Sequence, residues 1–85
     1  MIILDVRTKN EYDNGHLDSA INHDIMDMLN GSYPAIDKNR EVYLYCESGN
    51  RSMMAKNLME KAGFQKVLDL GSIDEAEGKI KNLNK

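Results

Sequence analysis

The sequence has little cysteine and few aromatic residues: one cysteine, no tryptophan and one phenylalanine among 85 residues. One cysteine excludes a disulfide within the chain, and one thiol with two histidines does not make a dedicated zinc site. No apolar run approaches the ~20 residues that cross a bilayer, so we expect no membrane contact. A free thiol and the lack of a signal peptide favour the cytoplasm, although a signal removed during maturation would leave no trace.

Net positive charge is also missing. The formal net charge is −3 and the isoelectric point is about 5.2, which argues against a nucleic-acid partner. Apolar residues make up 41% of the chain and charged residues 29%, as in ordinary folded proteins. The length predicts a single domain over residues 1–85. Since no apolar stripe stands out, a monomer is the simplest expectation.

Strand-like and helix-like segments alternate along the chain, which predicts an α/β fold with a small parallel sheet flanked by helices on both faces. We expect strands at 1–6, 20–22, 42–46 and 67–70, and helices from Thr8 to Gly15, at 24–30, at 51–62 and at 73–83. Ligands bind at the carboxyl ends of such strands. This edge is predicted to hold Asp5, Asn22, Cys46 and Leu70. Four of the six methionines, Met26, Met28, Met53 and Met54, are interpreted as core residues.

The segment after the best strand carries the one pattern with clear chemistry. Cys46 is followed by Glu47, Ser48, Gly49 and Asn50, and then by Arg51 at the start of the best helix. A tight loop there turns backbone N–H groups inward, and the helix N-terminus adds positive potential. Both effects favour a thiolate. Gly49 permits a positive φ, and Arg51 supplies a charged donor. We therefore expect Cys46 to be a nucleophile.

Several ordered motifs resemble the rhodanese (sulfurtransferase) family in its small single-domain form. The opening motif is Ile3 to Arg7, the second is Gly15 to Asn22, and the active-site loop is Tyr45 to Ser52. The match continues to about Gly71. The resemblance also implies a minimal domain, because the strand and helix that usually precede the first motif are missing.

The resemblance implies a sulfurtransferase that moves sulfane sulfur through a persulfide on Cys46, with no cofactor and no metal. The loop from Glu47 to Arg51, with Ser48, Gly49 and Asn50 between them, would bind the substrate and the persulfide. The donor would be thiosulfate or another small sulfur anion, a polysulfide, or a protein persulfide. The acceptor would be a thiol or a cyanide-like molecule.

Two other functions stay open. One is a rhodanese-like module that binds a partner or senses oxidants. The other is a cysteine-dependent phosphatase, which the loop disfavours because only four residues separate Cys46 from Arg51, whereas phosphatases of related architecture have five.

The charges beside the loop raise a question about the donor. Glu47 places a negative charge in the loop, where some thiosulfate-using members carry basic residues, so thiosulfate is expected to be a poor donor. Asp5 and Arg7 end the first strand and are candidates for the rim of the site.

Overall fold

The computed structural model describes residues 1–83, in which strands and helices alternate throughout. Their bounds are β1 (Ile2–Asp5), α1 (Lys9–Asp13), β2 (Ile21–Asn22), α2 (Ile25–Leu29), β3 (Glu41–Cys46), α3 (Asn50–Lys61), β4 (Lys66–Ser72) and α4 (Ile73–Leu83). Within these residues no helix is long and apolar enough to cross a membrane.

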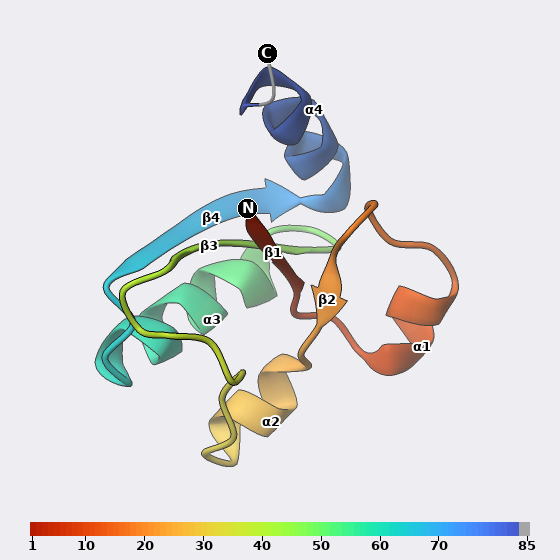
Figure 1. Cartoon of the computed structure of the whole chain (residues 1–85). Helices are drawn as coiled ribbons and strands as arrows, with labels where there is room; N and C mark the ends of the chain where they lie inside the picture. The colour runs from red at the N-terminus through yellow and green to blue at the C-terminus, as the bar shows by residue number, and fades with distance from the viewer. Residues whose placement is uncertain (84–85) are drawn as a thin grey trace.

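The four strands form one parallel sheet in the order β2-β1-β3-β4 (Figure 1). This confirms the predicted α/β class. Asp5 pairs with Asn22 on one side and with Tyr45 on the other, so the carboxyl ends of the first three strands meet at one edge.

The fourth strand differs from the prediction, because β4 continues past Leu70. A register shift between Leu44 and Cys46 places Cys46 opposite Ser72. Between these two paired positions β4 therefore contains one more residue than β3. Ser72, not Leu70, is therefore the β4 residue that lies level with the cysteine.

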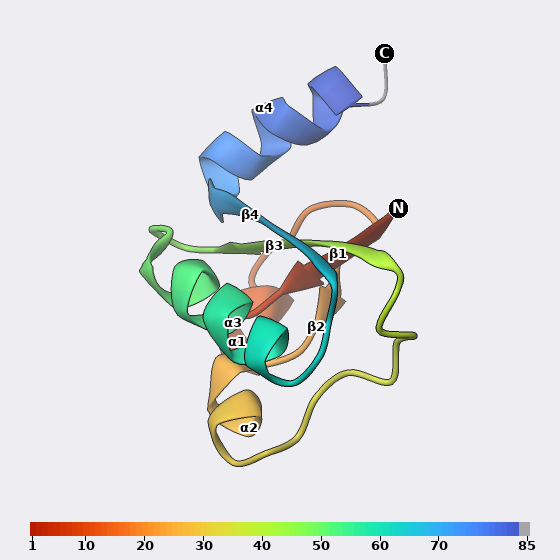
Figure 2. The same cartoon turned by 90° about the vertical axis from the view of Figure 1, so that its left-hand side faces the viewer.

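Helices cover both faces of the sheet, with α4 above it and α2 and α3 below it in two perpendicular views (Figures 1 and 2). Alternate β3 residues point to opposite faces. Val42, Leu44 and Cys46 join the core under α2 and α3, whereas Tyr43 and Tyr45 join the second core, to which α4 contributes Ala76. The strand alternation therefore directs Cys46 toward α3.

The methionine interpretation was wrong at three of the four positions. Met28 is buried in the core, but Met26, Met53 and Met54 are 56%, 57% and 49% exposed. Helix α3 buries Ser52, Ala55 and Met59, a set at helical spacing that leaves Met53 and Met54 on its outer side.

Candidate active site

Cys46 ends β3, and its side chain has no exposed surface. Its Sγ accepts hydrogen bonds from two backbone N–H groups, that of Gly49 at 3.0 Å and that of Ser52 at 3.3 Å. The Ser52 hydroxyl lies 3.6 Å from the same sulfur. Two N–H dipoles directed at one atom, with the N-terminus of α3 behind them, stabilise negative charge on that atom. The surroundings of Cys46 therefore suit an anionic sulfur.

Gly49 makes the turn that brings these donors together. Its φ of 97° is the left-handed conformation that a residue with a Cβ rarely adopts, and the residue serves as the N-cap of α3. An added Cβ would also contact the backbone of Gly71, at 3.6 Å. This is the positive φ predicted for Gly49.

Ser52 ends the loop motif and was given no role in the predicted site, yet it ties the loop together. It is fully buried in the first turn of α3, and its hydroxyl donates to the carbonyl of Gly49 at 3.0 Å. The carbonyl of Gly71 lies 3.4 Å from the same hydroxyl. A polar side chain six residues after the cysteine, on the buried face of the expected helix, was the signal that could have identified it.

Arg51 lies in the first turn of α3 and binds a carboxylate from another part of the chain. Its Nη1 and Nη2 donate to the two carboxylate oxygens of Glu11, at 2.6 Å and 2.8 Å. The hydrogen bond to Glu11, more than any other contact, raises the pKa of Arg51. Both terminal nitrogens of this loop arginine are thus engaged within the protein.

Asp5 and Arg7 form a second, more deeply buried pair at the end of β1. Asp5 is 0% exposed and Arg7 is 4% exposed. Asp5 accepts hydrogen bonds from Nε of Arg7 at 3.0 Å and from Nη2 at 2.6 Å. Nη2 also donates to the carbonyl of Gly15, and Nη1 donates to Glu47 at 2.9 Å. Arg7 therefore links the first strand to the loop that follows Cys46.

The remaining loop residues lie at the surface. Glu47, Ser48 and Asn50 are exposed, and the Glu47 side chain is 58% exposed even though it is paired with Arg7. Together the paired groups comprise three carboxylates, on Asp5, Glu11 and Glu47, and two guanidinium groups. The formal charge of this set is −1.

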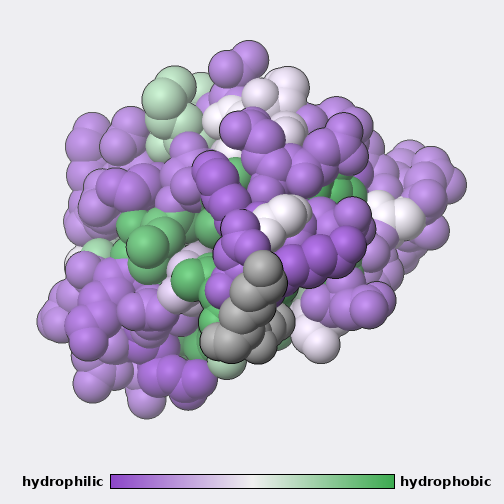
Figure 3. Space-filling view, turned by 90° about the horizontal axis from the view of Figure 1, so that it is seen from above, coloured by the Kyte–Doolittle hydropathy of each residue, from purple (hydrophilic) through white to green (hydrophobic). Residues whose placement is uncertain are grey.

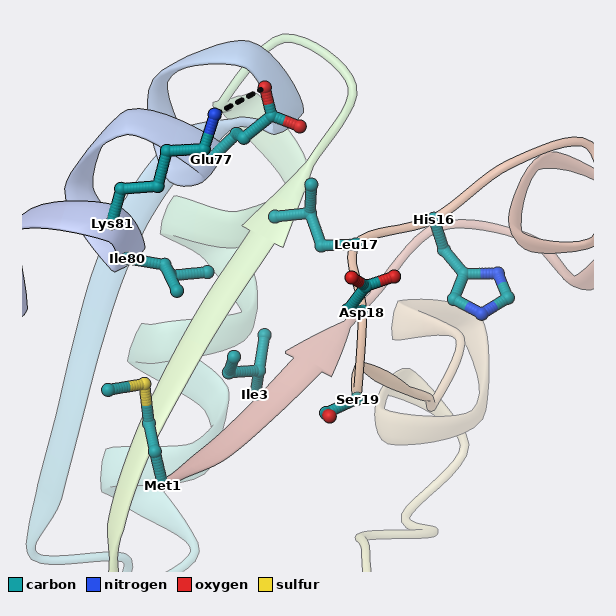
Figure 4. Close-up of a pocket in the computed structure, with 9 residues that line it drawn as sticks. All are labelled: Met1, Ile3, His16, Leu17, Asp18, Ser19, Glu77, Ile80 and Lys81. Carbon is teal, nitrogen blue, oxygen red and sulfur yellow. Dashed lines mark ion pairs between the residues drawn. The ribbon is translucent and has the colours of Figure 1, made fainter. Parts of the chain in front are cut away.

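A separate hollow of about 550 Å³ lies on the α4 side of the molecule. Figure 4 shows its walls, with Ile3, Leu17 and Ile80 on the inside and the Glu77–Lys81 ion pair at its edge. Figure 3 views the molecule from this side and shows patches of apolar surface among hydrophilic side chains. None of its lining residues belongs to the loop after Cys46, so this hollow is not where the cysteine would meet a substrate.

A family model of the rhodanese-like domain matches residues 1–78. The chain therefore belongs to the rhodanese-like domain family. The thiosulfate sulfurtransferase PspE of Escherichia coli is 32% identical over 80 residues, covering 92% of this chain and 77% of that protein. The crystal structure of the Rhodanese_3-like domain of Alr3790 from Anabaena superposes with a TM-score of 0.80 at 32% identity, covering 93% of this chain and 91% of that one.

Other relatives are longer proteins. The putative sulfur carrier protein YrkF of Bacillus subtilis is 37% identical over 68 residues, which is 80% of this chain and 36% of that protein. The chain spans only 19% to 36% of the length of the two curated relatives that share 37% identity with it.

Proposed function

We propose that this chain is a sulfurtransferase in which Cys46 accepts a sulfane sulfur, holds it as a persulfide and passes it to a thiol or cyanide-like acceptor. The observation that carries the proposal is the convergence of the Gly49 and Ser52 N–H groups on a single buried sulfur. The names of the relatives, a thiosulfate sulfurtransferase and a putative sulfur carrier, support the same chemistry.

The proposed reaction has two displacement steps. The Cys46 thiolate attacks the outer sulfur of the donor, a new S–S bond forms, and the donor's own S–S bond breaks. Thiosulfate leaves as sulfite and a persulfide donor leaves as a thiolate, each taking the electron pair of the broken bond. An acceptor thiolate or cyanide then attacks the outer sulfur, and the Cys46 thiolate leaves.

The residues of the loop have separate roles in this proposal. Backbone N–H groups of the loop from Glu47 to Arg51, together with that of Ser52, stabilise the negative charge carried first by the thiolate and then by the persulfide. Ser48, Gly49 and Asn50 form the turn that aims these groups. Because Cys46 has no exposed surface, residues of the loop must move aside before a donor reaches Sγ.

A cysteine-dependent phosphatase is less well supported. Arginine frequently recognises phosphate by donating from both of its terminal nitrogens to the ligand. Here the Arg51 guanidinium offers both to Glu11 instead. A rhodanese-like module that binds a partner or senses oxidants remains the alternative, and stable uptake and release of sulfur separates it from a transferase.

The test is intact mass spectrometry after incubation with thiosulfate, or with polysulfide in a second sample. We expect an adduct of about 32 Da, one sulfur atom, which cyanide removes. Cys46 is the only cysteine, so Cys46→Ser will abolish the adduct. Ser32→Ala, at an exposed serine outside the loop, is the control for a substitution of the same size, and it will keep the adduct. Failure of the wild-type chain to gain sulfur from either donor would contradict the proposal.

A further inference from the structure

The sequence alone did not show that Glu11 lies against the loop arginine Arg51. It is separated from Arg51 by 40 residues, yet its carboxylate holds both terminal nitrogens of that guanidinium. Arg51 is the loop residue that would otherwise offer a charged donor to an anionic substrate. Since the pair lies beside the loop and is about one-third exposed, solvent ions and substrates can reach it.

Glu11 is held firmly in this position by its own helix. It is the third residue of α1 and forms a reciprocal capping box with Thr8. Its Oε1 accepts from the Thr8 backbone N–H at 3.1 Å and from Arg51 at 2.6 Å. Hydrogen bonding from Arg51, more than any other contact, lowers the pKa of Glu11 to about 2. The carboxylate therefore stays ionised throughout the physiological pH range.

The charged side chains beside the loop consequently do not favour the binding of a dianionic donor. The two arginines beside the loop are both paired, and the paired set has a formal charge of −1. Asp24, at the start of α2, adds a further negative charge that acts on Arg51. Thiosulfate carries two negative charges into this environment and leaves as a sulfite dianion. A persulfide on a thiol carries one negative charge at most.

We propose that Glu11 is a specificity-determining residue that engages Arg51 and thereby makes the Cys46 site prefer a weakly charged persulfide donor over dianionic thiosulfate. This inference rests on the proposed sulfurtransferase function. Glu11 does not touch the reacting sulfur, so it acts through Arg51 and through the local charge. The donor itself reacts as described above, and only its affinity for the loop changes.

The test compares wild type with Glu11→Gln, using thiosulfate and the persulfide of 2-mercaptoethanol as donors. Glutamine keeps the capping box and one oxygen for Arg51 but removes the charge. We expect kcat/KM for thiosulfate to rise several-fold and kcat/KM for the persulfide, which carries at most one negative charge, to change less than about twofold. In about 0.5 M sodium chloride, which screens exposed charges beyond a few ångströms, the thiosulfate gain will shrink.

Glu60→Gln is the matched control. Glu60 is paired with Lys56 on α3, so the substitution removes the same charge and an ion pair from the same helix, away from the loop. We expect no change in kcat/KM for either donor. An equal effect of Glu11→Gln on both donors, or a gain that salt does not reduce, would mean that Glu11 acts only through loop structure and would overturn the inference.

Wild type alone provides a second measurement that does not depend on the folding of a variant. Because like charges repel, kcat/KM for dianionic thiosulfate will rise with added salt, and that for the persulfide, which carries at most one negative charge, will rise less. A fall in the thiosulfate value with salt would show net attraction and overturn the inference. The mass test keeps the two proposals apart: uptake of sulfur without this donor preference refutes only the role of Glu11.

Discussion

Arg7→Met should destabilise the protein strongly, because the substitution leaves a buried carboxylate without its partner. Asp5 has no exposed surface, and the Arg7 side chain supplies its charge-compensating hydrogen bonds from Nε and Nη2. In the variant Asp5 keeps the backbone N–H of residue 7, at 2.9 Å, as a partner. Methionine fills much of the space but carries neither charge nor donors.

The expected loss follows from the burial of this pair. Removing one partner of a buried ion pair costs about 3–5 kcal/mol in free energy of unfolding. A small domain has only about 5–15 kcal/mol in total. With about 4–8 °C per kcal/mol for a chain of this size, the melting temperature should fall by about 12–40 °C. The variant is therefore expected to be partly unfolded at physiological temperature.

Urea denaturation followed by far-ultraviolet circular dichroism measures the effect. The double variant Asp5→Asn with Arg7→Met should recover more than half of the loss, since no buried charge remains. Lys9→Met is the matched control: it removes an exposed cation that is paired with Asp13, and it should change nothing measurable. A loss below about 1 kcal/mol for Arg7→Met, or no recovery in the double variant, would refute the reasoning.

Three further predictions concern the edge of the site. Glu47→Gln removes the carboxylate that Arg7 holds, so kcat/KM for thiosulfate should rise several-fold at low salt. An equal rise with the less charged persulfide donor would indicate a change of loop geometry instead. The lowered pKa of Glu11, about 2 against 4.5, means that its pair with Arg51 stabilises the fold above pH 4.5 and is lost toward pH 2. After solvent screening the stabilisation from this ion pair amounts to about 1 kcal/mol. The difference in urea midpoint between wild type and Glu11→Gln should therefore vanish as the pH falls from 4.5 toward 2. Gly71→Ala should lower the free energy of unfolding by about 1–2 kcal/mol in the same urea assay, because φ at this position is 88°. The new Cβ would also lie 2.8 Å from Oε1 of Glu75, the carboxylate that accepts from the Ser72 N–H at the start of α4.

The local part of the fold could be predicted from the sequence. Continuous apolar runs marked the strands, and Thr8 marked the start of α1, because these signals act over a few residues. The turn at Gly49 was predictable for the same reason. The exposure of Met53 and Met54 was not, since only the packing of α3 against the sheet decides which side of that helix is covered.

The partners of the two arginines could not be predicted. Both pairs, Arg51 with Glu11 and Arg7 with Glu47, join residues 40 positions apart, and no local pattern records such a contact. Arg51 was therefore predicted only as a charged donor of the loop, and its carboxylate partner was not identified. The pairing of β1 with β3 is what brings their following segments together.

The parallel sheet explains why the loop after Cys46 depends on so many distant segments. All four strands point the same way, so the connections that follow β1, β3 and β4 emerge at one edge. Each of the other two connections contacts the loop: the segment after β1 through Arg7 and Glu11, and the end of β4 through the Gly71 carbonyl beside the Ser52 hydroxyl. Substitutions in these segments can therefore change the reactivity of Cys46 while leaving the residues that touch its sulfur unaltered.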